Sequence, residues 1–170
     1  MAEPELADWA YAAGFVDGEG CIAITRSFVT ARNKFAYSVA VVVTNRERVV
    51  LDWMRDLWHG CVVASSAAGG NARQSWAWRI SGTRCEAFLS GIRPLVRIKA
   101  PQCDNALAMI EVIKRSRYTL GRKFMPPEWL QLQVKHYWIQ REMNHRGTVP
   151  YEAVPMHSPR KIHRARAYGR

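Results

Sequence analysis

Two carboxylate residues at the end of an expected helix are the part of this sequence best suited to chemistry. Asp17 and Glu19 alternate with glycines in the segment Asp17-Gly18-Glu19-Gly20. The first twenty residues contain five acidic residues and no Lys or Arg, so the rest of the chain holds 25 basic and nine acidic residues, a balance of +16. Carboxylates that face nucleic acid repel its phosphates unless a divalent cation lies between them. The acidic segment therefore predicts metal-dependent chemistry on a polyanion.

The composition of the whole chain indicates the same kind of partner. The 170 residues carry a net charge of +11 and have a pI near 10.0, which favours nucleic acid first and anionic membranes second. Hydrophobic residues make up 48% of the chain, which excludes a mainly disordered protein. No apolar run approaches the roughly 20 residues of a membrane span, so we expect no membrane partner.

The N-terminus and the cysteines bear on location. The first residues are acidic and match neither a signal peptide nor a transit peptide. The four cysteines lie far apart without a Cys-x-x-Cys pair, which is typical of reduced thiols in a cytosolic protein. We expect a cytoplasmic, nucleoid-associated protein if the host is a bacterium, or an organellar one if an organelle encodes it.

The helix that carries the acidic segment has two distinct faces. Proline favours the first helical turn and glycine ends helices, so the helix is expected to begin near Pro4 and to stop at Gly18 to Gly20. One face has a core stripe at helical spacing and another has residues with almost no side chain. The core stripe is Leu6, Trp9, Ala13 and Val16, and the small-residue face is Ala10, Gly14 and Gly18.

Alternating and β-branched patterns after this helix predict two β-hairpins, each followed by a helix. Two further helices begin at Pro101 and Pro127, and together these elements form one domain over residues 1–147 with a basic, loosely ordered tail at 148–170. The expected strands are 21–29, 35–43, 61–66 and 74–81, and capping-box patterns open helices at Thr44 and Thr83.

The glycines of the first helix predict contact with a second copy. Without Cβ atoms at Gly14 and Gly18, two such helices can approach backbone to backbone. Two identical helices packed in this way bring their Glu19 carboxylates together, which is costly without cations. Hard oxygen ligands suit Mg²⁺, or Mn²⁺ as an alternative, rather than zinc.

Residues Ala12-Ala13-Gly14-Phe15-Val16-Asp17-Gly18-Glu19-Gly20, followed by the strand Cys21-Ile22-Ala23-Ile24, resemble the LAGLIDADG motif of homing endonucleases. The resemblance to single-motif members extends over roughly residues 6 to 145. It implies an α+β fold of order αββαββα, with a four-stranded antiparallel saddle sheet and additional C-terminal helices. It also implies a site-specific, metal-dependent endonuclease that cuts a long pseudo-palindromic duplex as a homodimer.

The resemblance assigns roles to individual residues. The last acidic residue of the motif, Glu19, and the carbonyl of Gly18 are the metal ligands, whereas Asp17 braces the helix end. Lys99 matches an active-site lysine, with a solvated lysine as the alternative. Asn45 matches a polar residue that positions solvent, with a helix N-cap as the alternative, and Arg46 or Arg48 supplies a second basic group. The expected dimer interface is Ala10, Gly14, Asp17 and Gly18, and the expected catalytic residues are Glu19, Lys99, Asn45 and Arg48.

The free face of the sheet is expected to lie in the DNA major groove, as in the resembled family, and a basic cluster is expected to follow the phosphate backbone. The sheet residues are Ala23, Thr25, Ser27, Ser38, Ala40, Val63, Ser65, Ser75, Ala77 and Arg79, and the basic cluster is Lys114, Arg115, Arg117, Arg122 and Lys123.

Two other functions are compatible with the same scaffold. One is an RNA-binding maturase that assists splicing of its own intron RNA, and the other is a catalytically inactive DNA-binding protein. The presence of Glu19 together with Lys99 argues against the inactive form.

Overall fold

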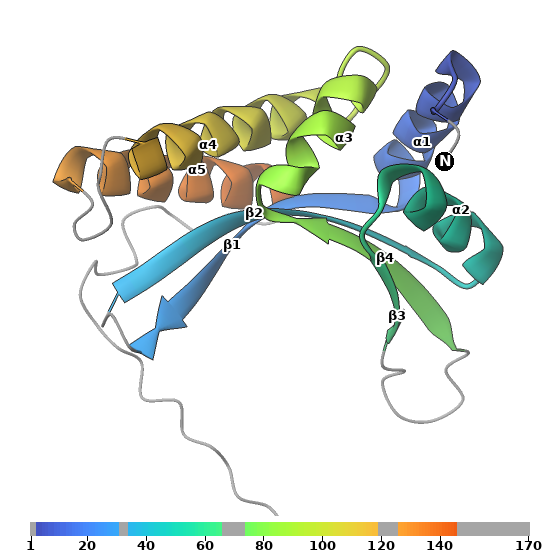
Figure 1. Cartoon of the computed structure of the whole chain (residues 1–170), viewed down its shortest axis with the longest axis horizontal. Coiled ribbons are helices and arrows are strands. Elements are labelled where there is room, and N and C mark those ends of the chain that lie inside the picture. The colour runs from blue at the N-terminus through green and yellow to red at the C-terminus, as the bar shows by residue number, and fades with distance from the viewer. Residues whose placement is uncertain (1–2, 31–33, 66–73, 119–125, 146–170) are drawn as a thin grey trace, which may run out of the picture.

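The computed structural model describes residues 3–30, 34–65, 74–118 and 126–145 (Figure 1). The expected tail at 148–170 and the basic residues Arg122 and Lys123 lie outside these ranges. Of Arg117, only the helical backbone is described. Within the described residues, no helix is both long enough and apolar enough to cross a bilayer.

The described residues form five α-helices and one four-stranded antiparallel sheet, which confirms the expected α+β architecture. The sheet has the strand order β1-β2-β4-β3, so the two hairpins meet through β2 and β4. A short 3₁₀ turn, Gly82–Arg84, precedes α3. The elements are α1 Leu6–Glu19, β1 Gly20–Val29, β2 Lys34–Asn45, α2 Arg48–Trp58, β3 Cys61–Ser65, β4 Ser75–Ser81, α3 Cys85–Ile92, α4 Ala100–Tyr118 and α5 Pro127–Asn144.

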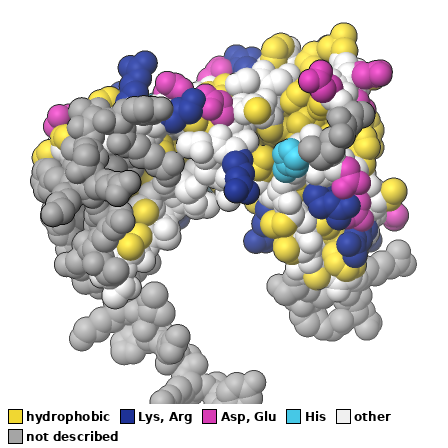
Figure 2. Space-filling model, viewed as in Figure 1, with side chains coloured by type: hydrophobic (Ala, Val, Ile, Leu, Met, Phe, Trp, Pro, Cys, Tyr) yellow, Lys and Arg dark blue, Asp and Glu magenta, His cyan; other side chains and the backbone are white. Residues whose placement is uncertain are grey.

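The sheet is arched, with all five helices on its convex side and its concave face open (Figure 1). Side chains alternate between the two faces along each strand, so residues paired across strands share a face. Ile22, Val41 and Ile80 are buried toward the helices and pair in register. The opposite face forms the hollow seen under the arch in Figure 2.

The register places the predicted DNA-facing residues on this open face and fixes the position of β3. On β1 and β2, Ala23 pairs with Ala40 and Thr25 with Ser38. The pairs on β3 and β4 that share this face are Val63 with Ala77 and Ser65 with Ser75, and Arg79 pairs with both Val42 and Cys61.

Three local expectations are corrected. Ala77 lies on the open face but is only 1% exposed, because it is flanked in register by the larger side chains of Thr44 and Val63, so it cannot contact DNA directly. Leu6 is 74% exposed and is not part of the core. The helix expected to open at Thr44 begins instead at Arg48, because β2 continues to Asn45.

The second expected capping box, at Thr83, is also absent. Neither the 3₁₀ turn nor α3 has a side-chain cap, and α3 begins at Cys85, directly after the 3₁₀ turn Gly82–Arg84. The chain reaches the helical conformation gradually from the end of β4, so no capping side chain is needed there.

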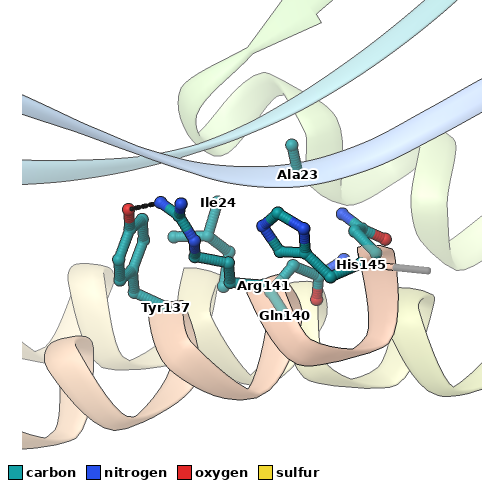
Figure 3. A pocket seen from close by; sticks show the side chains of 7 residues that line it. Ala23, Ile24, Tyr137, Gln140, Arg141 and His145 are labelled. Atoms are coloured by element: carbon teal, nitrogen blue, oxygen red, sulfur yellow. Dashed lines mark hydrogen bonds between the residues drawn. The ribbon is translucent and has the colours of Figure 1, made fainter. Parts of the chain in front are cut away.

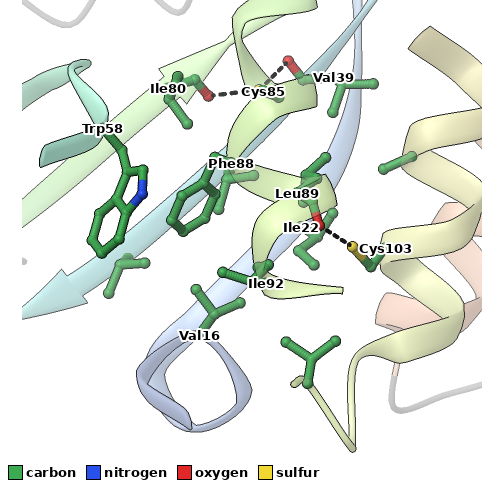
Figure 4. Packing of buried hydrophobic residues seen from close by; sticks show 14 of the residues in the cluster. Val16, Ile22, Val39, Trp58, Ile80, Cys85, Phe88, Leu89, Ile92 and Cys103 are labelled. Atoms are coloured by element: carbon green, nitrogen blue, oxygen red, sulfur yellow. Dashed lines mark hydrogen bonds between the residues drawn. The ribbon is translucent and has the colours of Figure 1, made fainter. Parts of the chain in front are cut away.

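The core between helices and sheet is built on aromatic and aliphatic contacts (Figure 4). The Trp58 ring lies 5.1 Å from that of Trp9 and 5.4 Å from that of Phe88, and Phe88 lies 5.0 Å from Trp78. These rings join α1, α2, α3 and β4 at one point. Aromatic pairs contribute about 0.5–1.5 kcal/mol each beyond the area they bury, and the tilted pairs of Trp9 with Trp58 and Phe88 hold α1 on its inner side.

The four cysteines are free thiols. Cys85 and Cys103 are buried, and their thiols donate to backbone carbonyls, as Figure 4 shows. Burial raises the pKa of Cys85 to about 12 and that of Cys103 to about 11. Both are therefore unreactive core residues at neutral pH.

Helix α5 packs along β1 through a chain of amide side chains. Gln140, only 1% exposed, donates from Nε2 to the carbonyl of Ile22 at 2.6 Å, and Asn144 donates to the same carbonyl at 2.8 Å. Asn105 of α4 donates to the Gln140 side chain at 2.9 Å and accepts from His136 Nδ1 at 2.7 Å. This network fixes α5 to both α4 and the strand that continues from α1.

The buried Gln140 amide provides a test of this network. We expect Gln140→Leu to lower the free energy of unfolding by about 1–3 kcal/mol, because the Asn105 amide loses a buried partner and the Ile22 carbonyl loses one of two donors. Urea unfolding followed by circular dichroism measures this change. The matched control is Gln131→Leu at an exposed position of the same helix, which should change stability by less than about 0.5 kcal/mol. Equal effects of the two substitutions would contradict the network.

Candidate functional site

The C-terminal end of α1 concentrates negative charge. Glu19 is the last residue of the helix and is exposed, and Asp17 lies half-buried in the same turn. The last turn contains no basic residue. Helix C-termini carry a partial negative charge from their free carbonyls, so a carboxylate there is unfavourable without a nearby cation. A positive charge placed close to the end of α1 would therefore stabilise it.

Lys99, which lies far from α1 in the sequence, supplies part of this positive charge. Its Nζ donates to the carbonyl of Val16 at 2.9 Å and also to the carbonyl of Asp17. The ammonium thus caps the C-terminal carbonyls of α1, which is the favoured position for a cation on a helix. Lys99 is not a freely solvated lysine, so the alternative interpretation of this residue is wrong.

Asp17 holds the segment that carries Lys99. Its Oδ2 accepts the backbone N–H groups of Arg97 at 2.7 Å and Ile98 at 3.2 Å, and its Oδ1 accepts that of Lys99 at 2.9 Å. Burial raises the pKa of the Asp17 carboxyl, but these backbone hydrogen bonds and the Lys99 charge together outweigh it and bring the pKa below its ordinary value. The carboxylate is therefore charged at neutral pH, and through these bonds Asp17 holds the segment 97–99 against the end of α1.

Gly20 completes the helix end. Its N–H donates to the Val16 carbonyl that Lys99 also contacts. A Cβ at Gly20 would lie 2.7 Å from that oxygen, so no side chain fits at this position. We call the arrangement of Asp17, Lys99 and the α1 carbonyls the helix-end clamp.

The donor set at this end fits a hard divalent cation only in part. Glu19 offers a carboxylate and Gly18 a backbone carbonyl at an exposed position, and both are oxygen donors of the kind Mg²⁺ accepts. Among the described residues, no group of three or more His, Cys, Asp or Glu side chains could hold a metal ion. One chain therefore supplies few of the ligands, and the remaining ones must come from water, from a phosphate or from a second chain.

Asn45 and Arg48 lie near this end but are engaged locally. Gly20 pairs with Val43, so Asn45 is two residues further along β2. The Asn45 Oδ1 accepts the N–H of Glu47 at 2.8 Å, and so the side chain shapes the turn into α2 without capping the helix. Arg48 Nε donates to Asp52 at 3.0 Å, and its guanidinium lies 4.6 Å from the centre of the Trp76 ring. Both side chains are therefore positioned by contacts within the chain.

The predicted basic cluster differs from expectation at its first residue. Lys114 Nζ lies 2.5 Å from a Glu86 oxygen and 3.4 Å from one of Glu111, so its charge is neutralised within the helical layer. Sequence inspection missed this because Glu86 is 28 residues away. Arg115 also lies near Glu111, at 3.9 Å, with 71% of its side chain exposed.

The outer face of α1 is an exposed stripe of apolar and small residues. Ala10, Gly14 and Gly18 are all exposed, and a Cβ on either glycine would meet nothing within 4 Å. Leu6 continues this stripe at the same four-residue spacing, and Tyr11 beside it is 56% exposed. Hydrophobic side chains gather over this part of the molecule in Figure 2.

A cavity of about 320 Å³ lies between α5 and β1 and was not predicted (Figure 3). Arg141 of α5 and His145 directly after this helix face β1 across the cavity, and Arg141 Nη1 donates to the Tyr137 hydroxyl at 3.0 Å. Helical spacing of Tyr137 and Arg141 is the signal that places them together, whereas nothing in the sequence indicates that α5 lies against β1.

The fold of this chain is similar to the folds of several solved structures. The sequence matches no protein-family model and no curated protein. The homing endonuclease I-CvuI, solved with the I-CreI target, is 17% identical, with a TM-score of 0.67 over 84% of each chain. The archaeal intron-encoded homing endonuclease I-Vdi141I, complexed with DNA, is 14% identical, with a TM-score of 0.68 over 86% of this chain and 89% of its own.

A longer LAGLIDADG homing endonuclease, I-LtrWI bound to target DNA, is 13% identical, with a TM-score of 0.61 over 81% of this chain and 44% of its own. This chain therefore has the fold of the LAGLIDADG homing endonucleases, as its motif indicated. The part that resembles I-CvuI and I-Vdi141I corresponds to most of each of those chains.

The helix-end clamp predicts coupled losses of stability. We expect Asp17→Ala and Lys99→Met each to lower the free energy of unfolding by about 1–2 kcal/mol, because each removes partners of part-buried backbone groups. The double variant should lose less than the sum, since either change alone releases the same segment. Urea unfolding of the four proteins measures the coupling.

Arg97→Met is the matched control for this cycle, because its backbone is held by Asp17 but its own side chain is exposed. It should leave stability within about 0.5 kcal/mol of the wild type. Strictly additive losses from Asp17→Ala and Lys99→Met would show that the two residues act separately.

Proposed function

We propose that the protein is a site-specific, metal-dependent endonuclease that cuts double-stranded DNA as a homodimer. The observation that carries the proposal is the end of α1, where exposed Glu19 and the Gly18 carbonyl stand beside Lys99 at the start of the open sheet face. The chain as a whole has a net charge of +11 and suits a negatively charged substrate. Because the end of α1 is itself acidic, a cation between this site and the substrate would be needed.

Glu19 and the Gly18 carbonyl would hold the divalent cation, Mg²⁺ or Mn²⁺. When bound, such an ion supplies charge stabilisation at the phosphate and lowers the pKa of a water ligand. The chain's own contribution is to fix these two oxygens: Gly20 and Lys99 hold the last turn of α1, and Asp17 holds Lys99. The Lys99 ammonium also places a positive charge next to the position a scissile phosphate would occupy.

The open face of the sheet would lie against the major groove. The hydroxyl of Thr25 donates to the carbonyl of Ser38 at 3.1 Å, and that of Ser38 donates to the Val39 carbonyl at 3.4 Å. Both oxygens remain able to accept hydrogen bonds from base edges, such as the amino groups of cytosine and adenine. The hollow under the arch offers a concave surface against which a duplex could lie (Figure 2).

The exposed stripe on α1 supports a homodimer. Leu6 and Tyr11 are largely exposed in the single chain, and Gly14 and Gly18 leave open space for another helix. Close approach of two such helices buries the stripe and places the two Glu19 carboxylates near each other. This chain covers only 44% of the longer I-LtrWI chain, which is consistent with a functional unit made of two copies of the present chain.

Removal of the proposed metal ligand tests the chemistry. We expect Glu19→Gln to reduce Mg²⁺-dependent cleavage of duplexes from a library of candidate sites by about 100-fold or more, the scale of losing one contact to the developing charge. Binding of the same duplexes should persist, because removing a negative charge does not weaken attraction to phosphate. Gel-based cleavage and fluorescence anisotropy measure the two properties.

Glu128→Gln is the matched control for this test, since Glu128 is an exposed carboxylate at the start of α5. It should cut at the wild-type rate. Cleavage by Glu19→Gln at the wild-type rate would contradict the ligand role. A wild-type protein that binds selected duplexes without cutting any of them would indicate a binding protein on this scaffold.

The helix contact predicts a change in oligomeric state. We expect the wild type to be a dimer at micromolar concentration without DNA, and Gly14→Gln to be a monomer, because the added side chain blocks the approach of the partner helix. The fold should tolerate this change, since a Cβ at Gly14 meets nothing within 4 Å and glycine is a poor helix former. Light scattering coupled to gel filtration gives the mass, and Ala87→Gln, at an exposed position of α3, is the control. A monomeric wild type would contradict the proposed interface.

A further inference from the structure

Arg79 of β4 is the one charged residue on the open sheet face among those whose side chains the structure describes. It pairs in register with Val42 on β2 and Cys61 on β3, and Cys21 completes the same row on β1. The other described residues of this face are Ala, Ser, Thr, Val and Cys, all with short side chains.

The guanidinium of Arg79 is available for an external partner. Arg79 is exposed, and it has no hydrogen-bond, ion-pair or ring partner within the described part of the chain. By comparison, Arg48 and Arg55 each contact an aspartate, and Arg26 lies over aromatic rings. The five N–H donors of the Arg79 guanidinium therefore remain unused, and the other described side chains on this face are too short to extend donors far from the sheet.

The backbone that carries Arg79 is held in place. A Cβ at Gly60, which has φ of +88°, would lie 2.4 Å from the Arg79 carbonyl, so the turn before β3 packs directly on this residue. The neighbouring Trp78 donates from Nε1 to the carbonyl of His59 at 2.7 Å. A side chain on a fixed backbone recognises a partner with more geometric precision than one on a mobile loop.

The row that contains Arg79 lies next to the candidate site. Cys21 follows Glu19 by two residues, so this row is the first on the open face after the end of α1. Adjacent strands are about 4.8 Å apart, which places Arg79 roughly 10 Å across the sheet from Cys21. A duplex lying in the arch would present to Arg79 the base pairs closest to the cleaved bonds.

We propose that Arg79 reads a guanine through its O6 and N7 atoms, once in each half of the target. This inference rests on the proposed function and adds the identity of a base to it. Arginine forms paired hydrogen bonds with these two acceptors in the major groove, and no other base offers both. The remaining described side chains on the face are short, so among them Arg79 is the one with paired donors for a base edge.

Selection from randomised duplexes tests the proposal. Wild type, Arg79→Ala, Arg79→Gln and Arg84→Ala are each used to select duplexes by binding, and each base at every position of the selected site is then compared. We expect Arg79→Ala to lose a guanine preference of about tenfold or more at one base pair per half-site and to keep its preferences elsewhere. Arg79→Gln should shift the preference at that pair toward adenine, the base that glutamine recognises.

Arg84→Ala removes an exposed arginine of the 3₁₀ turn that precedes α3 and should keep the wild-type profile. The shift in Arg79→Gln is a gain, so it cannot arise from misfolding. Unchanged preferences in both Arg79 variants, or a uniform loss of affinity for all sequences, would overturn the proposal. A wild type that selects no sequence would overturn the proposed function instead.

Discussion

The charge at the C-terminal end of α1 is the constraint on which the rest of the structure depends. A helix that ends in carboxylates is electrostatically unfavourable, and this chain places Asp17 and Glu19 in one last turn without a basic residue. The fold offsets that cost with the ammonium of Lys99 and with three backbone N–H groups from the same distant segment. Asp17 is thereby fully used inside the chain, whereas Glu19 remains exposed and available. Asp17 and Glu19 differ in this way because the backbone N–H groups of residues 97–99 reach the carboxylate of Asp17.

Much of the fold follows from local patterns in the sequence. Alternation along 21–29 and 74–81 indicates strands with one buried face, and the glycines after Asp17 indicate where the first helix ends. These signals depend on neighbours within a few residues, and so a single sequence contains them. The boundaries were less predictable, because β2 extends to Asn45 through its pairing with Trp76 on a strand 31 positions later. Leu6 fits a core stripe by spacing alone, but it is the first residue of α1 and lies in line with Ala10 on the exposed face, whereas Ala13 and Val16 of the same predicted stripe are buried.

The candidate site could be predicted only in part for the same reason. The motif identifies Glu19, Gly18 and Asp17, since they are consecutive and chemically distinctive. The bond between Lys99 and the Val16 carbonyl spans 83 residues and uses a backbone acceptor that every residue type possesses. Likewise, the ion pair of Lys114 with Glu86 and the burial of Ala77 depend on packing between elements. The face of the sheet was predictable from alternation, whereas the contacts of each side chain on it were not.

The amide groups of α5 have a consequence for the behaviour of the protein in concentrated solution. β1 is an outer strand of the sheet, and the unpaired carbonyls of such a strand are a ready template for a strand of another molecule. Gln140 and Asn144 both donate hydrogen bonds to the Ile22 carbonyl, so α5 lies along the outer edge of β1. Uncontrolled sheet extension is thereby obstructed near the beginning of β1. Under the proposed function the chain would be crowded along a polymer such as DNA, and this protection would oppose aggregation there.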